Sequence, residues 1–187
     1  MIYVLVGRSG SGKSSIEREL VKQRPEFFRV ISDTTRPVRD GEVCGVDYHY
    51  LTREGFTKGI IRGDYIEHTS YNGWYYGVNK HRIDLRLGDY ICVTNPSGYY
   101  QLKKHFGDKV VGIVIHTDDK QRILNYLHRE ENPDCYECCR RFIADANDFV
   151  DIEKDPSLHH VKNVMGSLDV TIKTILEFID STRGEAR

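Results

Sequence analysis

The sequence predicts an α/β fold in three layers, in which helices cover both faces of a five-stranded parallel sheet. Two observations predict it. Short apolar, β-rich runs alternate with segments of helical periodicity, and no repeat or Pro/Gly/Ser-rich linker interrupts that alternation. At roughly 100–200 residues per domain, the length of 187 residues indicates one domain spanning 1–187.

The expected strands are five short apolar runs, at residues 2–6, 27–31, 90–94, 110–115 and 160–164. Helices are expected between them at about 13–23, 96–106 and 119–129. A last helix, near 167–180, has the clearest pattern. Its aliphatic residues fall on one face at helical spacing: Leu168, Ile172, Ile175, Leu176 and Ile179.

Two segments depart from this alternation. Residues 47–77 are rich in tyrosine and turn residues, which predicts a small β-rich insertion between the second and third core strands. The sequence Asn132-Pro133-Asp134 predicts the end of one helix and the start of the next. Two such lobes on one core are typical of a protein that closes over its ligand.

The charge balance excludes some classes of function. Lys and Arg number 27 against 28 Asp and Glu, whereas an indiscriminate nucleic-acid or acidic-membrane binder needs a basic surplus. No apolar run approaches the ~20 residues of a membrane span, and the chain opens with no signal-peptide pattern. The cysteines number five, an odd count that favours a reducing compartment, so we expect a cytoplasmic protein. From the charge balance and the short apolar runs, we expect that its partners are neither nucleic acid nor membrane. Residues 1–40 nevertheless carry eight Lys and Arg against five Asp and Glu, so the neutral total does not exclude an anionic substrate.

A phosphate-binding motif follows the first expected strand. Its sequence is Gly7-Arg8-Ser9-Gly10-Ser11-Gly12-Lys13-Ser14, which matches G-x-x-x-x-G-K-[ST] between a strand and a helix. The glycines let backbone N–H groups point at a polyphosphate, and the start of the helix adds its positive end. Lys13 would place its charge between the β- and γ-phosphates, and the Ser14 hydroxyl would ligate Mg²⁺. The motif predicts a P-loop NTPase fold that binds ATP or GTP through these residues and Ser15.

A second cluster begins at Ser32. Arg36 and Arg39 flank Pro37 in an extended segment, so both guanidinium groups can converge on one anion. The region resembles the signature of the guanylate kinase family in Thr34-Thr35-Arg36-Pro37-Val38-Arg39-Asp40-Gly41-Glu42, Gly45-Val46-Asp47-Tyr48, Tyr65-Ile66-Glu67 and Trp74-Tyr75-Tyr76-Gly77. Together with the phosphate motif, the resemblance runs in order along nearly the whole chain.

The resemblance implies a nucleoside monophosphate (NMP) kinase that uses ATP and Mg²⁺, with GMP or dGMP as the preferred acceptor. It implies that the acceptor phosphate is held by Arg36, Arg39, Tyr48 and Tyr76, and that guanine contacts Ser32 and Glu67. It also assigns to the NMP-binding site Glu42, Val78 and Asn95. The chain would then divide into a core (about 1–31, 86–118 and 158–187), an NMP-binding lobe (about 32–85) and a helical lid (about 119–157).

On the ATP side, the resemblance implies that Lys13 acts with catalytic arginines of the lid, namely Arg129, Arg140 and Arg141. It also implies an adenine contact at Asn163. The acceptor phosphate has a second pKa of about 6, so it arrives largely ionised. Transfer then depends on positioning and charge neutralisation, and no general base is needed.

The chain departs from the family pattern at the base-binding end. Val78 stands where the family has a hydroxyl that bonds guanine O6, and Val93 and Asn95 stand where it has carboxylates. The loss of the hydrogen bond to guanine O6 would weaken the preference for this base by about 0.5–1.5 kcal/mol. Two alternatives stay open: an NMP kinase with another base preference, and a non-catalytic guanylate-kinase-like binding module. The run Cys135-x-x-Cys138-Cys139 does not predict a zinc site, because no second ligand pair accompanies it.

Overall fold

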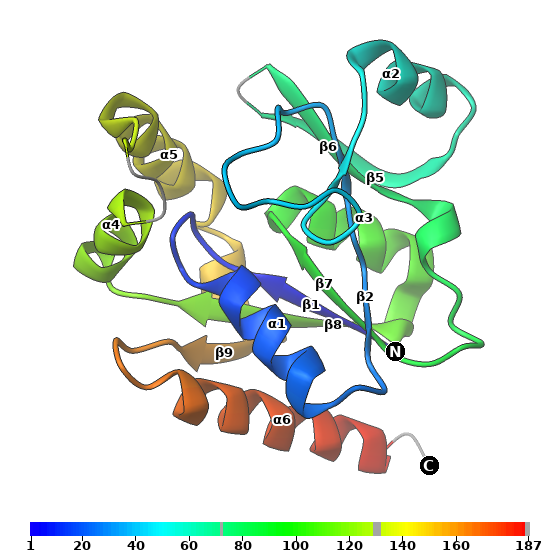
Figure 1. Cartoon of the computed structure of the whole chain (residues 1–187). Coiled ribbons are helices and arrows are strands. Elements are labelled where there is room, and N and C mark those ends of the chain that lie inside the picture. Colours follow the sequence, from blue (N-terminus) through cyan, green and yellow to red (C-terminus); the bar gives the residue numbers. More distant parts are fainter. Residues whose placement is uncertain (72, 129–131, 186–187) are drawn as a thin grey trace.

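The computed structural model describes residues 1–71, 73–128 and 132–185. Its core is a parallel five-stranded sheet in the order β2-β7-β1-β8-β9 (Figure 1). The strands are β1 (Ile2–Val6), β2 (Phe28–Arg29), β7 (Tyr90–Thr94), β8 (Val110–His116) and β9 (His159–Lys162). The predicted parallel sheet is confirmed. Strand β2 is shorter than the predicted run 27–31, since Phe27 packs into the core and Phe28 lies exposed at the sheet edge.

Helices cover both faces of this sheet, which confirms the three predicted layers. The helices that do so are α1 (Lys13–Gln23), α3 (Pro96–Phe106) and α6 (Leu168–Glu185). Tyr3 and Leu5 of β1 face α1 and α6, while Val4 faces α3 and Phe149 on the opposite side. Because neighbouring strand residues point to opposite faces, one short strand contributes to both halves of the core. Helix α6 continues past its predicted end at 180.

The β-rich insertion predicted at 47–77 contributes three strands to a second sheet, in the order β4-β3-β6-β5, and β3 joins it from an earlier part of the chain. Its strands are β3 (Asp33–Thr34), β4 (His49–Tyr50), β5 (Tyr65–Tyr71) and β6 (Trp74–Asn79). The insertion also contains helix α2 (Arg53–Ile61), which the sequence pattern does not predict. This helix contains two glycines, and Phe56 is the large side chain that it buries, so it has no apolar stripe. Its local signal is Thr52, whose hydroxyl accepts the Gly55 N–H at 3.1 Å as the N-cap.

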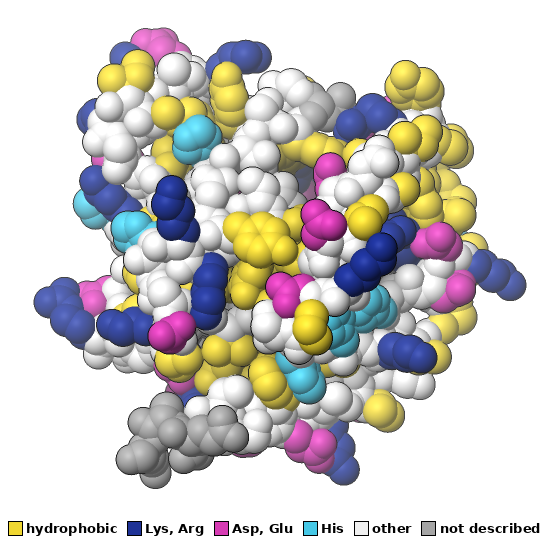
Figure 2. All heavy atoms as spheres, turned by 180° about the vertical axis from the view of Figure 1, so that it is seen from behind, with side chains coloured by type: hydrophobic (Ala, Val, Ile, Leu, Met, Phe, Trp, Pro, Cys, Tyr) yellow, Lys and Arg dark blue, Asp and Glu magenta, His cyan; other side chains and the backbone are white. Residues whose placement is uncertain are grey.

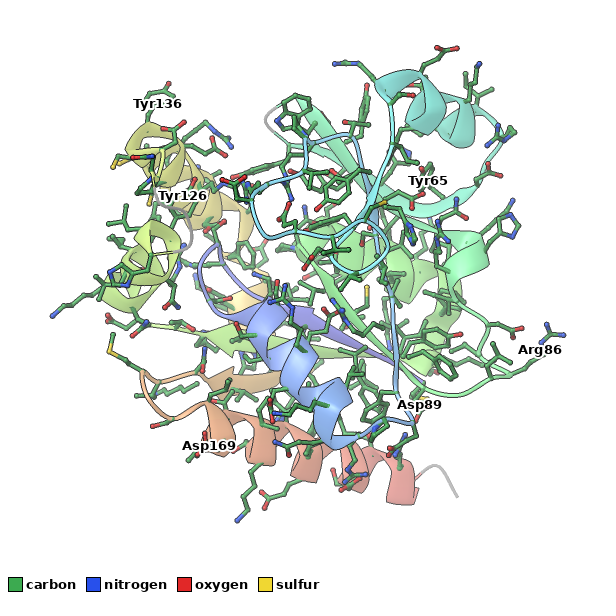
Figure 3. All side chains as sticks on the ribbon, in the orientation of Figure 1. Tyr65, Arg86, Asp89, Tyr126, Tyr136 and Asp169 are labelled. Atoms are coloured by element: carbon green, nitrogen blue, oxygen red, sulfur yellow. The ribbon has the colours of Figure 1, made fainter. Side chains whose placement is uncertain are left out.

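Two further helices stand beside the carboxyl end of the core sheet (Figure 1). They are α4 (Asp119–Leu127) and α5 (Cys135–Asp148). Each begins after an aspartate whose carboxylate accepts backbone N–H groups, Asp118 and Asp134, so the predicted break at Pro133 is confirmed. The end predicted for the first of them, at 129, lies outside the described residues. Tyr126 of α4 is buried, whereas Tyr136 of α5 points into solvent (Figure 3).

Short 3-10 helices complete the described structure: η1 (Lys80–Arg82), η2 (Gly107–Lys109) and η3 (Ile152–Lys154). On the face seen in Figure 2, acidic and basic side chains are interspersed, with no large area of one sign. This distribution agrees with the net charge of −1. Within the described ranges, no helix combines the length and the apolar character that crossing a bilayer requires.

Candidate functional site

The phosphate motif, residues 7–14, forms the turn between β1 and α1, and we call it the phosphate loop. Gly10 and Gly12 have φ angles of 76° and 87°, in the left-handed region that favours glycine. Space is also restricted, because a Cβ on Gly10 would collide with the Arg122 carbonyl oxygen and one on Gly12 with the Asn163 side chain. Gly12 is the N-cap of α1, so the unpaired N–H groups of the first helical turn open onto the loop.

Lys13 lies beneath this loop. Its Nζ donates to the carbonyl oxygens of Gly7 at 2.5 Å and Arg8 at 3.0 Å. Burial of the ammonium lowers the pKa of Lys13 to about 8, while the Asp145 carboxylate acts in the opposite direction. The Arg8 side chain forms an ion pair with Glu153, with Nε at 2.7 Å and Nη2 at 2.6 Å from the carboxylate oxygens. Arg8 therefore contributes its backbone, and not its guanidinium group, to the phosphate loop.

Two cavities meet over the phosphate loop. The loop cavity has a volume of about 750 Å³ and extends from the loop to Asn125 on α4 and to Asn163 after β9. The tyrosine cavity has a volume of about 220 Å³ and lies between Glu67, Tyr76 and Asn95. The side chains that line both cavities mark their junction: Ser9, Lys13, Ser32, Arg39, Tyr48, Val93 and Arg141. Three of these are cations from three separate segments, so the junction can neutralise two polyanions placed end to end.

The two arginines of the second cluster take different positions. Arg36 is buried, and its Nη2 donates to both carboxylate oxygens of Glu42 at 2.8 Å. Its guanidinium carbon lies 5.5 Å from the centre of the Tyr48 ring. Glu42 also accepts the Arg39 backbone N–H at 3.0 Å and the Tyr50 hydroxyl at 2.8 Å. Burial acts to raise the pKa of Glu42, but these donors lower it, and the charged Glu42 fixes Arg36 at the wall of the tyrosine cavity.

Strand β5 directs alternate side chains into the tyrosine cavity, namely Glu67, Thr69 and Tyr71. Glu67 is 3% exposed, and its Oε2 has no hydrogen-bond partner among the described residues. Burial raises the pKa of Glu67 to about 7, against a smaller opposing effect of the Val78 backbone N–H. A buried carboxylate oxygen without a donor is costly, so this cavity suits a ligand that donates hydrogen bonds.

The remaining predicted acceptor residues line the tyrosine cavity, except one. The Tyr48 and Tyr76 ring centres are 6.1 Å apart, and burial raises the pKa of Tyr48 to about 12, so its hydroxyl remains a donor. Ser32 lies at the junction of the cavities. Asn95 lines the cavity and also caps α3, because its Oδ1 accepts the Gly98 N–H at 2.8 Å.

Val78 is the exception, and the structure corrects its predicted place in the site. Its side chain is completely buried in the same core cluster as Cys92, and it lines neither cavity. The reason is that β6 passes from the cavity into the apolar core at this point, so Val78 reaches Glu67 through its backbone N–H alone. Thr69 and Thr94, which both carry hydroxyl groups, are among the residues that line the tyrosine cavity.

Two of the three arginines predicted on the lid are described, and they differ in whether they line the cavities. Arg129 lies outside the described residues. Arg140 is bound by Glu137 through Nε at 2.6 Å and Nη2 at 2.9 Å, and it lines neither cavity. Arg141 bonds Glu137 through Nε at 2.7 Å and lines both cavities. Their guanidinium carbons lie 4.5 and 5.2 Å from the centre of the Tyr71 ring, so β5 contacts α5 here.

Asn163 and Ser14 border the loop cavity. The Asn163 Nδ2 donates to the Ser11 carbonyl oxygen at 3.0 Å, so Asn163 holds the phosphate loop as well as lining the cavity. Ser14 is exposed in the first turn of α1. Within the described part of the chain, no three His, Cys, Asp or Glu side chains are grouped in a way that could hold a metal ion. A single hydroxyl beside a phosphate cavity fits Mg²⁺, which takes most of its ligands from water and substrate phosphates.

Two buried side chains that the sequence pattern did not single out also reach the loop. The Nε of Arg122 on α4 donates to the Ser9 carbonyl oxygen at 2.9 Å, and Asp145 on α5 accepts the Ser9 N–H at 2.8 Å. The sequence feature that could have identified them is a charged residue at a helix position where an apolar residue is expected. Asp145 lies in the buried stripe of α5 between Cys138 and Phe149, at helical spacing.

The chain is similar to known proteins in sequence and in overall fold. The guanylate kinase family model matches residues 1–91. The chain is 31% identical to the guanylate kinase of Thiobacillus denitrificans over 157 residues, which cover 82% of this chain and 74% of that protein. It is also 31% identical to the guanylate kinase of Sus scrofa over 170 residues, which cover 89% of this chain and 85% of that protein. Among solved structures, a guanylate kinase from Anaplasma phagocytophilum has the same fold, with a TM-score of 0.69 at 22% identity over 97% of this chain and 85% of that one.

Proposed function

This chain belongs to the guanylate kinase family, and we propose that it transfers a phosphoryl group from ATP to a nucleoside monophosphate, with GMP or dGMP as the preferred acceptor. The observation that carries the proposal is the junction of the two cavities. Lys13, Arg39 and Arg141 line both cavities there. Two nucleotides whose phosphates face each other accumulate negative charge at one point, and cations fixed at that point stabilise the transferring group.

In this proposal ATP binds in the loop cavity. Its phosphates contact the Lys13 ammonium and backbone N–H groups of residues 7–15 other than that of Ser9, which Asp145 accepts, and its adenine lies near Asn163. The exposed Ser14 hydroxyl at the start of α1 supports the assignment of Mg²⁺ to this residue and the ATP phosphates. When bound, the ion neutralises charge on the β- and γ-phosphates.

The acceptor binds in the tyrosine cavity. Its phosphate is assigned to Arg36, Arg39, Tyr48 and Tyr76, with Glu42 holding Arg36 in place, and its nucleoside to Ser32, Glu67 and Asn95. A carboxylate can accept the N1–H and the N2 amino group of guanine together, and adenine has no such donor pair on that edge. The buried and unpartnered Oε2 of Glu67 supports this assignment.

The protein contributes positioning and charge neutralisation. The second pKa of the acceptor phosphate is about 6, so its oxygen is already a nucleophile. Lys13 and Arg141 hold the transferring group in line between the nucleotides. We further propose that residues 32–85 and 119–157 close as two lobes over the core (1–31, 86–118 and 158–187). Closure excludes water, which would otherwise hydrolyse ATP.

Replacing Glu67 with glutamine tests the base recognition in this proposal. The change keeps the size of the side chain but exchanges one acceptor oxygen for an NH₂ donor, which then faces the donors of guanine. Hydrogen bonds to charged groups contribute about 1.5–3 kcal/mol, so we expect kcat/KM for GMP to fall roughly 10–150-fold. A coupled ADP-release assay measures this loss. The matched control is Glu54→Gln on α2, where the side chain is 77% exposed. An unchanged kcat/KM for GMP in Glu67→Gln would contradict the assignment.

Because the pKa of Glu67 is raised, we expect both KM for GMP and the stability of the protein to depend on pH, and Glu67→Gln tests both effects. The ionised carboxylate is the form that accepts from guanine, so we expect KM for GMP in the wild type to fall as pH rises through about 7, and Glu67→Gln to lose this component. The stability of the nucleotide-free protein, in contrast, should fall as pH rises. Burial raises the folded-state pKa of Glu67 above its unfolded value, so the stability present at low pH is lost as pH rises through about 7. Above that pH, Glu67→Gln should therefore have a higher Tm than the wild type.

A further inference from the structure

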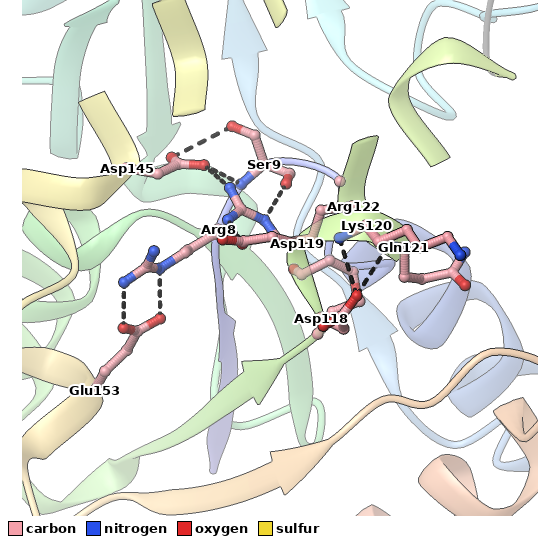
Figure 4. A network of polar contacts seen from close by, with 12 residues as sticks. Arg8, Ser9, Asp118, Asp119, Lys120, Gln121, Arg122, Asp145 and Glu153 are labelled. Carbon is pink, nitrogen blue, oxygen red and sulfur yellow. Dashed lines mark hydrogen bonds and ion pairs between the residues drawn. The ribbon is translucent and has the colours of Figure 1, made fainter. Parts of the chain in front are cut away.

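A charged side chain, Arg122 of α4, is the largest of the completely buried side chains in the described structure. Each of its guanidinium nitrogens donates to a different residue (Figure 4). Nε bonds the Ser9 carbonyl oxygen at 2.9 Å, Nη1 bonds Asp119 at 2.6 Å, and Nη2 bonds Asp145 at 2.5 Å. The ring of Phe142 lies 4.1 Å from the guanidinium carbon. A buried guanidinium is tolerated when its donors are matched in this way, and removal of one partner leaves it uncompensated.

The Asp145 carboxylate joins α5 to the same network. It is 5% exposed, and its Oδ2 accepts both the Arg122 guanidinium and the Ser9 N–H, the latter at 2.8 Å. The Ser9 hydroxyl lies 3.4 Å from Oδ1. Ser9 is thus held on both sides, because its carbonyl oxygen bonds α4 and its N–H bonds α5. The next residue, Gly10, is also held, since its carbonyl oxygen accepts the Asn125 Nδ2 at 2.8 Å.

These contacts restrict a segment that its own sequence would leave free. Gly10 and Gly12 have access to many backbone conformations, and a phosphate loop binds a polyphosphate when its N–H groups are held in one of them. The bonds to Ser9 and Gly10 come from α4 and α5, more than a hundred positions away in the sequence. The conformation of the loop therefore depends on where these two helices are docked.

We propose that Asp145 is a positioning residue, which couples the ATP-binding conformation of the phosphate loop to the docked position of α4 and α5. This inference rests on the proposed function in assigning ATP to the loop. Asp145 acts through its bonds to Ser9 and Arg122 and through its charge on the Lys13 ammonium, and it is assigned no contact with the transferring group. Loss of its carboxylate frees the Ser9 N–H and leaves Arg122 with Asp119, so the loop becomes mobile and binds ATP less tightly.

The test compares Asp145→Ala and Asp145→Asn with the matched control Asp119→Asn. Asp119 bonds the same guanidinium, but it is exposed and no bond joins it to the loop in the described structure. Hydrogen exchange of the loop amides is measured in the nucleotide-free protein, and the Kd of a non-hydrolysable ATP analogue with Mg²⁺ is measured by calorimetry. For Asp145→Ala we expect Ser9 exchange and Kd each to rise roughly tenfold, and for Asp119→Asn both to stay within about threefold.

Two further readouts separate positioning from a general loss of stability. KM for GMP should change less than the Kd of the ATP analogue in Asp145→Ala, because Asp145 lines the tyrosine cavity but every residue assigned to GMP is kept. Asp145→Asn keeps the volume and one acceptor oxygen, so it should fall between wild type and Asp145→Ala, and it decides the question if the alanine variant does not fold. Unchanged Ser9 exchange, tighter binding of the analogue, or faster exchange spread over the core sheet would overturn the inference. A wild type that does not bind the analogue would instead contradict the proposed function.

Discussion

Replacing Lys13 with alanine is expected to lower kcat for phosphoryl transfer roughly 10²–10³-fold. The ammonium belongs to the phosphate loop and lines both cavities. The Gly7 and Arg8 carbonyl oxygens hold it at 2.5 and 3.0 Å, so the chain itself positions the ammonium. Negative charge at the transferring group is best matched in the transition state, so the loss should appear in kcat more than in the KM of either nucleotide.

The matched control for this variant is Lys22→Ala in the last turn of the same helix, where the lysine side chain is 77% exposed. It removes the same charge from α1 but no group that lines a cavity, so kcat should stay within about twofold of the wild type. Both variants are compared by coupled ADP release at saturating ATP and GMP, with Tm as the check that each is folded. Wild-type turnover by Lys13→Ala would show that the phosphate loop does not perform the proposed role.

Replacing Arg141 with alanine is expected to lower kcat roughly 10²–10³-fold, whereas Arg140→Ala should stay within about fivefold of the wild type. The two arginines are neighbours on α5, and each gives up an ion pair with Glu137 when it is replaced. They differ in position, because Arg141 lines both cavities and Arg140 lines neither. The difference between the variants therefore reports the charge at the junction.

Two measurements make the comparison of these arginines decisive. Coupled ADP release with ATP and GMP gives kcat, and calorimetric titration with GMP alone shows whether the acceptor cavity is intact. We expect GMP binding to be retained in both variants within about fivefold, since Arg36, Tyr48 and Glu67 are unchanged. A larger loss of kcat in Arg140→Ala than in Arg141→Ala would contradict the assignment.

Features with local signals could be predicted from the sequence. Strand β1, helix α1, strand β7 and helix α3 have the predicted bounds, because strand-like runs, a phosphate motif and a proline at the start of a helix are read from neighbouring residues. The residues that the resemblance assigns to the acceptor, except Val78, also line one or both of the two connected cavities. Their spacing places them on segments that the sheet order brings to one edge.

Features that depend on contacts between distant segments could not be predicted. Arg122 and Asp145 look like ordinary charges on two amphipathic helices until the fold places both against Ser9. Val78 stands at the chain position that the family pattern assigns to base recognition, but β6 enters the core at this residue and its side chain is buried there. Tyr71 likewise becomes a contact with α5 through the packing of β5 beside that helix.

The central claim is transfer of a phosphoryl group from ATP to a guanine mononucleotide. It is tested most directly by a coupled ADP-release assay in which MgATP is combined in turn with GMP, dGMP, AMP, CMP, UMP and dTMP. We predict that kcat/KM for GMP and dGMP exceeds that for the other acceptors by at least about tenfold, because the other bases lack the adjacent N1–H and N2 amino donors that the buried Glu67 carboxylate can accept together. Equal values for every acceptor would contradict guanine recognition, and ATP binding without ADP release for any acceptor would contradict phosphoryl transfer itself.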